Sequence, residues 1–213
     1  MIPRLVAFAQ RHPWWWLLAY LVVSAGLYQL AIRVPLYTPF IVRPTALDHA
    51  IPLVPWTAAP YLTYFLLMPS FVWLSRHNPR RGALLVAAAL VVLGNLALNN
   101  LVPTEIADPI TPAIAAALDA PLLQQIVSSD TPRAALPSGH LALPLALAVL
   151  AFRAHLPGRW LYVPWTIVMA ITILTTKQHY LPDAIGGLVW GSIGPLLMWR
   201  WVGRSTWRGS LAA

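Results

Sequence analysis

The chain contains no cysteine and few charged residues. Without cysteine, disulfide bonds and thiolate chemistry are excluded. Charged side chains make up 9% of the 213 residues, whereas soluble domains carry about 25%. Hydrophobic residues make up 59%, and neither a soluble domain nor an internal repeat is evident. The composition excludes an ordinary soluble domain and indicates an integral membrane protein.

Six apolar runs are candidates for membrane spans, for which a helix needs about 20 residues. They cover about residues 14–32, 58–74, 83–101, 139–152, 160–175 and 183–201. The first run stays apolar beyond a passable signal-peptidase site near Ala25, so we expect it to be retained. We therefore predict an all-α fold, with residues 1–213 forming one integral membrane bundle of six transmembrane helices. An outer loop over 103–137 contains an amphipathic piece at 113–127, broken at Pro121.

The distribution of charge orients this bundle. If the N-terminus is cytoplasmic, ten of the fourteen basic residues fall on the cytoplasmic side, as the positive-inside rule expects. These ten are Arg4, Arg11, Arg76, Arg80, Arg81, Arg153, Arg159, Arg200, Arg204 and Arg208. All six acidic residues fall on the outer side: Asp48, Glu105, Asp108, Asp119, Asp130 and Asp183. We expect both termini to be cytoplasmic, in a plasma membrane or bacterial inner membrane.

This scattered charge also argues against nucleic acid as a partner, although the formal net charge is +8. The arginines lie in separate loops and tails, where they act as topology signals. Only four basic residues fall on the outer side: Arg33, Arg43, Arg133 and Lys177. Three histidines share that side, namely His49, His140 and His179. The outer face is therefore where a functional site is expected.

The first candidate motif is Pro137-Ser138-Gly139-His140, at the start of the fourth predicted span. Serine can cap a helix, and glycine leaves the backbone open to close approach. The amides at a helix N-terminus, together with the positive end of its dipole, favour anions. His140 would then face a bound anion and donate a proton. The alternative is an ordinary capped helix start with a histidine at the level of the lipid headgroups.

The second motif is His179-Tyr180-Leu181-Pro182-Asp183, before the sixth span. Pro182 suits the first turn of a helix, which would hold Asp183 at the helix start. A carboxylate four residues after His179 can reach one imidazole nitrogen and leave the other as a nucleophile. The alternative is that Asp183 is only an acidic helix cap and His179 an interfacial residue.

Taken together, the two motifs predict one site for phosphoryl transfer. Both lie on the same side, and ionisable residues beside membrane spans are usually functional. Two histidines, one carboxylate and nearby cations supply a nucleophile, an orienting group, an acid and a charge clamp. A metal site is disfavoured, because Arg133 and Lys177 would oppose a bound cation.

These residues carry a resemblance to the type-2 phosphatidic acid phosphatase superfamily of membrane lipid phosphatases. The family pattern is K-x6-R-P, then P-S-G-H, then S-R-x5-H-x3-D. The second block is complete at 137–140, and the third ends in the expected His179 and Asp183. The resemblance implies six spans and a nucleophilic His179 that forms a phosphohistidine, supported by Asp183. It further implies that His140 protonates the leaving oxygen, that Ser138 and Gly139 bind phosphate, and that no metal or other cofactor is required.

Three cations of the family pattern are missing. Asn95 and Val102 stand where the first block has lysine and arginine, and Thr172-Ile173 replaces the Ser-Arg pair of the third. A phosphate dianion in a site of low dielectric constant still needs compensation. We therefore expect the outer cations to bind phosphate, in the order Arg133, Lys177, Arg43 and Arg33. The alternative for Arg43 and Arg33 is that each only marks the level of the lipid headgroups. Asp130 is a candidate to orient Arg133, or it is merely solvated in the loop.

The departures also resemble the branch that contains the inositol phosphorylceramide synthases, at Ala50–Trp56 and around Thr176–Tyr180. We predict a lipid phosphatase that cleaves a phosphomonoester or diphosphate from a membrane lipid at the outer, extracytoplasmic face. The first alternative is a lipid phosphotransferase, whose acceptor is a lipid or inositol hydroxyl in place of water. The second is a non-catalytic carrier of a lipid or anion. Phosphatidate, phosphatidylglycerophosphate and polyprenyl diphosphate are all candidate substrates.

Overall fold

The computed structural model describes residues 1–34 and 36–210, with side chains to residue 204, so the side chain of Arg208 lies outside it. Helices fill the predicted apolar runs. They are α2 (Pro13–Arg33), α4 and α5 (Ala58–Leu62 and Leu67–Leu74), α6 (Arg81–Leu101), α9 (Gly139–Arg153), α10 (Tyr162–Thr175) and α11 (Leu181–Ser210). Short 3-10 turns η1 (Pro55–Thr57), η2 (Thr63–Leu66) and η3 (Arg159–Leu161) complete the α4–α5 and α10 segments.

By length and composition, four of these segments can cross a membrane: Pro13–Arg33, Pro55–Leu74, Arg81–Leu101 and Leu181–Arg204. Gly139–Arg153 and Arg159–Thr175 are shorter apolar helices. The outward faces are apolar: Trp15 and Val22 on α2, for example, are 66% and 65% exposed. Such surfaces suit lipid and not water, so the prediction of a mainly helical membrane bundle is confirmed.

The centre of the bundle is the packing of α9 against α11 and α6. Close approach of α11 depends on glycine, as the Gly186-Gly187 pair predicts. A Cβ atom at Gly187 would lie 2.6 Å from the carbonyl oxygen of Ser138, and one at Gly191 would lie 2.7 Å from that of Ala142. On α6, a Cβ atom at Gly94 would lie 2.5 Å from the ring of Trp190. These contacts fix the start of α9 against the start of α11.

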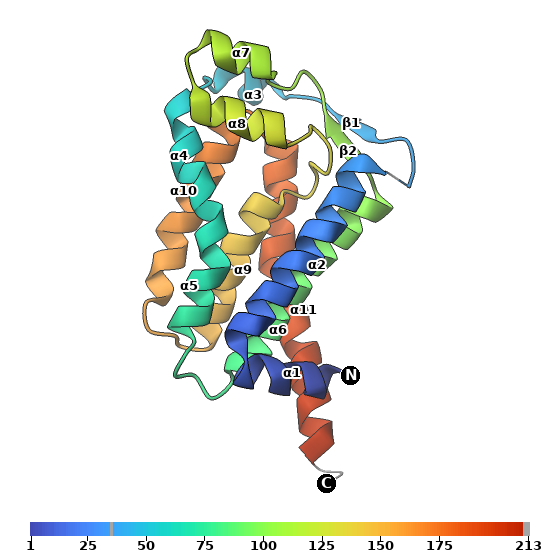
Figure 1. Cartoon of the computed structure of the whole chain (residues 1–213), viewed down its shortest axis with the longest axis vertical. Coiled ribbons are helices and arrows are strands. Elements are labelled where there is room, and N and C mark those ends of the chain that lie inside the picture. The colour runs from blue at the N-terminus through green and yellow to red at the C-terminus, as the bar shows by residue number, and fades with distance from the viewer. Residues whose placement is uncertain (35, 211–213) are drawn as a thin grey trace.

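One end of the bundle, called the sheet end below, carries the short elements β1 (Phe40–Val42), α3 (Ala46–Ala50), β2 (Thr104–Ile106), α7 (Pro112–Ala117) and α8 (Pro121–Ser129) (Figure 1). The two strands pair in parallel, with Ile41 opposite Glu105. They add one short parallel pair to an otherwise helical bundle, because two loops far apart in sequence meet edge to edge. The predicted break at Pro121 is confirmed, since α8 begins there.

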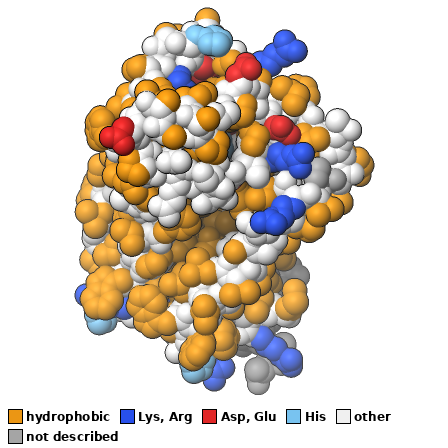
Figure 2. Space-filling model, turned by 45° about the horizontal axis from the view of Figure 1, so that its top comes forward, with side chains coloured by type: hydrophobic (Ala, Val, Ile, Leu, Met, Phe, Trp, Pro, Cys, Tyr) orange, Lys and Arg blue, Asp and Glu red, His pale blue; other side chains and the backbone are white. Residues whose placement is uncertain are grey.

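At the other end, α1 (Ile2–Arg11) lies across the bundle beside the start of α6 (Figure 1). The amide of Gly82 donates to Oε1 of Gln10 at 2.6 Å. Hydrophobic side chains dominate the face in Figure 2, which is hollowed near its middle, while the acidic side chains seen there lie towards the sheet end. The side of the bundle is therefore apolar. Its two ends differ, since one carries the strands and short helices and the other is crossed by α1.

Candidate functional site

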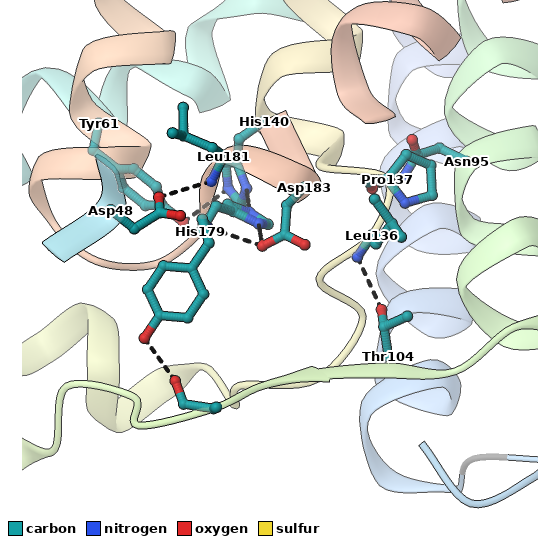
Figure 3. Close-up of polar contacts among 12 residues, drawn as sticks. Asp48, Tyr61, Asn95, Thr104, Leu136, Pro137, His140, His179, Leu181 and Asp183 are labelled. Carbon is teal, nitrogen blue, oxygen red and sulfur yellow. Dashed lines mark hydrogen bonds and ion pairs between the residues drawn. The ribbon is translucent and has the colours of Figure 1, made fainter. Parts of the chain in front are cut away.

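The two histidine motifs meet at the sheet end. His140 is the second residue of α9, and His179 lies in the turn between α10 and α11. The backbone amide of Ser138 donates to the carbonyl of Asp183 at 3.1 Å, which ties the two motifs together. As a result, Nδ1 of His140 lies 3.4 Å from Nε2 of His179. The structure thus brings together three residues predicted to be catalytic, His140, His179 and Asp183 (Figure 3).

Asp183 lies on the far side of the His179 ring. Its Oδ2 atom is 3.6 Å from Nδ1 of His179 and accepts a hydrogen bond from the Tyr180 amide at 2.9 Å. Both side chains are buried, with Asp183 fully so. Among the described residues, neither Nδ1 of His179 nor Oδ1 of Asp183 has a hydrogen-bond partner. A small closure, common when substrate binds, would complete the bond between carboxylate and imidazole.

The other face of His140 is closed by two tyrosines that the sequence motifs did not predict. The hydroxyl of Tyr61 lies 3.0 Å from Nε2 of His140, and the two rings stack at 4.7 Å. Tyr64 packs on the same imidazole with ring centroids 4.4 Å apart. Their spacing of three residues places them on one helical face. That spacing was the available signal, but it is equally typical of core aromatic residues.

Ser138 and Gly139 start α9 in an unusual way. Ser138 occupies the N-cap position, but its side chain makes no capping hydrogen bond, so the expected serine cap is wrong. Its Oγ atom is buried without a partner among the described residues. Gly139 lies against Asn95, whose Nδ2 would be 3.4 Å from a Cβ atom there. The first turn of α9 therefore offers backbone amides and an unused hydroxyl.

Asn95 confirms that α6 reaches this site. Its Nδ2 atom donates to the carbonyl of Pro137 at 3.1 Å, next to the start of α9 (Figure 3). This is the position at which the family pattern has lysine, so a neutral amide lies where the family pattern places a cation. The site consequently has less positive charge than the pattern implies.

The extra strand explains the placement of Arg133. The amide of Leu136 donates to Oγ1 of Thr104 at 2.9 Å, so β2 holds the segment that precedes α9. Nε of Arg133 pairs with Oε2 of Glu105 at 3.1 Å, and Nη1 donates to the carbonyl of Ile32 at 3.1 Å. The suggestion that Asp130 orients Arg133 is wrong, because Glu105 does so. Asp130 instead accepts from the hydroxyl of Tyr28 and from the Thr131 amide.

Lys177 and Arg43 are not brought to the histidines. Nζ of Lys177 donates to the carbonyls of Asp48 and Ile51, both at 2.6 Å, and so fastens α3 to the turn before α11. Burial lowers the pKa of Lys177, and the nearby Asp48 carboxylate opposes that shift. Arg43 is exposed on the loop after β1. Lys177 has a structural role instead of the predicted contact with phosphate.

The buried carboxylate of Asp48 completes this fastening. Its Oδ1 atom accepts from the Leu181 amide at 2.8 Å, and its Oδ2 atom accepts from Thr45 (Figure 3). The chain before α11, including His179, is therefore held from α3. Sequence patterns assigned Asp48 no role beyond a share in the outer negative charge.

A cavity of about 510 Å³ opens beside the histidines. Its lining at the sheet end includes Tyr28, Asn95, Asp130, Arg133, His140 and His179. Deeper along the helices the lining is mostly apolar, with Leu21, Phe65, Val91, Val92 and Leu143. Arg133 is the only arginine or lysine of this lining within the part of the chain that the structure describes. The cavity is therefore polar beside the histidines, a part called its polar head below, and apolar deeper along the helices, a part called its apolar body.

Among the described residues, no group of three or more His, Cys, Asp or Glu side chains could hold a metal ion. Comparisons of the chain with protein-family models, curated proteins and solved structures returned no match.

Proposed function

We propose that the chain is an integral-membrane lipid phosphatase that releases phosphate from a lipid phosphomonoester or diphosphate through a phosphohistidine on His179. One observation carries this proposal: His140 and His179 line the polar head of a cavity whose body is apolar, and Asp183 lies behind His179. A nucleophile, an orienting carboxylate and a proton donor meet there, beside room for a lipid chain.

In the proposed reaction, Nε2 of His179 attacks phosphorus, and the bond from phosphorus to the lipid oxygen breaks. His140, protonated on both ring nitrogens for this step, gives one proton to that leaving oxygen and becomes neutral. Asp183 stabilises the positive charge that develops on the His179 ring. In the second half, His140 takes a proton from water, the resulting hydroxide displaces phosphate from His179, and both histidines return to their first state.

The surrounding groups support the binding of a phosphate. The first turn of α9 offers amides and the positive end of its dipole. Arg133, from the cavity wall, adds a cation that Glu105 holds in place. The apolar lining further along α2 and α6 suits the acyl or prenyl chain of a lipid.

A second candidate, lipid phosphotransfer, is favoured by the weak positive charge of the site. Asn95 stands in place of a lysine, and Arg133 is already paired with Glu105. A phosphodiester carries one negative charge and needs less compensation than a monoester dianion. Neutral polar side chains in the lining, such as Asn99, Gln125 and Gln178, suit a hydroxyl-rich acceptor. Transfer uses the same phosphohistidine and differs only in which hydroxyl attacks it.

The proposed setting is a plasma membrane, or a bacterial inner membrane, crossed six times. The excess of arginine at the α1 end supports cytoplasmic termini. The cavity then opens at the extracytoplasmic face. The two shorter helices, Gly139–Arg153 and Arg159–Thr175, would complete the six spans.

A panel of labelled lipids tests both candidates. Detergent-solubilised protein is incubated with phosphatidate, phosphatidylglycerophosphate, polyprenyl diphosphate and a phosphodiester lipid, each with and without a free hydroxylated acceptor. Release of inorganic phosphate supports the phosphatase, and a new phosphorylated product supports the transferase. If the lipids bind but all stay intact, the chain is a carrier and the proposal is wrong.

A further inference from the structure

The side chain of Tyr61 contacts Nε2 of His140, the ring nitrogen that faces away from His179. Its hydroxyl lies 3.0 Å from Nε2, its ring stacks on the imidazole at an interplanar angle of 30°, and the side chain is 4% exposed. On the other side of the imidazole, Nδ1 faces Nε2 of His179 at 3.4 Å. Each ring nitrogen of His140 therefore faces one specific polar group.

The carboxylate of Asp183 determines the direction of this chain of contacts. It is fully buried, and a buried carboxylate is stabilised by a facing N–H and repelled by a facing lone pair. The proton of neutral His179 therefore belongs on Nδ1, which faces Oδ2 of Asp183 at 3.6 Å. Nε2 of His179 is then left with its lone pair, directed at His140.

The same reasoning passes to the next ring. Facing a lone pair on His179, Nδ1 of neutral His140 is stabilised when it carries the proton, because two facing lone pairs repel. Nε2 of His140 must then accept a hydrogen bond. The hydroxyl of Tyr61 can supply it, with its proton directed at Nε2.

We propose that Tyr61 is a positioning residue that holds His140 in the tautomer with its proton on Nδ1. In this state the Nδ1 proton of His140 is shared with Nε2 of His179, which holds the two rings in register before substrate binds. The other tautomer, which free histidine favours, would direct the proton at the wall formed by Tyr61. The tautomer follows from the contacts alone, whereas its value for catalysis rests on the proposed function.

Tyr64 provides a matched control within the same wall. Its ring packs on His140 at 4.4 Å, as closely as that of Tyr61, but within the described residues no hydrogen bond joins its hydroxyl to His140. Tyr61→Phe and Tyr64→Phe each remove one oxygen from one ring that packs on His140. Only the first removes a partner of Nε2.

Nitrogen NMR of the full chain in lipid bilayers, with isotope-labelled histidine, tests the proposal without any substrate. The signals of His140 are assigned by their loss in His140→Gln, and protonated and unprotonated ring nitrogens are well separated. We expect the proton on Nδ1 in the wild type and in Tyr64→Phe, and on Nε2 in Tyr61→Phe. A wild-type proton on Nε2, or the same tautomer in Tyr61→Phe as in the wild type, would overturn the proposal. If Tyr61→Phe fails to fold, the wild-type spectrum alone decides.

Turnover of a lipid from the panel gives the second readout. We expect kcat of Tyr61→Phe to fall about tenfold or more, because the acid is misaligned, with KM unchanged and with Tyr64→Phe close to the wild type. Equal losses in both variants would show that Tyr61 acts only by packing. An inactive wild-type protein would refute the proposed function and leave the spectroscopic result intact.

Discussion

Oδ2 of Asp183 lies 3.6 Å from Nδ1 of His179, four residues earlier in the chain, and both side chains are buried. Asp183→Asn keeps an oxygen for the Tyr180 amide but removes the negative charge that orients the imidazole. We expect kcat to fall by about 10²-fold or more, with the fold retained. Steady-state kinetics and a circular dichroism melt would check this. Unchanged kcat would contradict the orienting role.

Arg133 is the cation expected to contact phosphate. Arg133→Ala removes a charged donor from the cavity wall, so we expect KM to rise about 10- to 100-fold, the equivalent of one or two charge-assisted hydrogen bonds. Arg43→Ala is the control, because that side chain is exposed on the loop after β1, outside the cavity. Equal effects of the two variants on KM would show that the charge of the phosphate is balanced by the overall positive charge of the sheet end and not by Arg133 in particular.

Glu105 holds Arg133 through the contact at 3.1 Å. In Glu105→Gln the arginine keeps its bond to Ile32 but loses its ion pair. If phosphate binding is limited by positive charge, the freed arginine should bind a monoester dianion more tightly and lower KM. Titration with inorganic phosphate as a competitive inhibitor measures this directly. A larger inhibition constant for phosphate in Glu105→Gln than in the wild type would show that the orientation of Arg133 matters more than its charge.

We expect Lys177 to contribute to the stability of the fold and not to substrate binding. Lys177→Met removes two hydrogen bonds to carbonyls, and we expect the free energy of unfolding to fall by about 1–3 kcal/mol. KM should stay within about twofold of the wild type, since its ammonium is outside the cavity lining. A large rise in KM with no loss of stability would restore the prediction that Lys177 binds phosphate.

Gly187 tests the packing that joins the two motifs. A Cβ atom there would lie 2.6 Å from the carbonyl of Ser138, so Gly187→Ala must push α11 away from the start of α9. We expect a thermal midpoint several degrees lower, from a loss of about 1–3 kcal/mol, together with reduced turnover. Gly26→Ala on α2, where nothing lies within 4 Å of the added atom, should be neutral or slightly stabilising. Equal effects in the two variants would contradict this account of the packing.

The long helices and the meeting of the two motifs were predictable because both follow from local sequence. Apolar runs of span length form helices in any arrangement, and proline with an acidic first turn marks the start of α11 at Leu181. The clustering of His140 with His179 required only that both motifs open helices at the same end.

The partners of these residues were not predictable, since they come from segments far apart in the chain. Tyr61 reaches His140 from 79 residues away, and Glu105 reaches Arg133 from 28 residues away through an unforeseen strand. The position of Lys177 depends on a backbone φ of 56° that directs its side chain to α3. No periodicity or motif encodes such contacts, which depend on how the loops pack at the sheet end.

Chemical trapping at His179 tests the central claim most directly. The protein is quenched in alkali shortly after addition of a lipid that carries radiolabelled phosphorus, digested, and mapped by mass spectrometry, because a phosphorus–nitrogen bond survives base and is cleaved by acid. His179→Ala and His49→Ala serve as matched variants. The account predicts an acid-labile label on the peptide that contains His179, absent from His179→Ala and retained in His49→Ala. Turnover of the lipid by His179→Ala at the wild-type rate, or a label on any other residue, would contradict it.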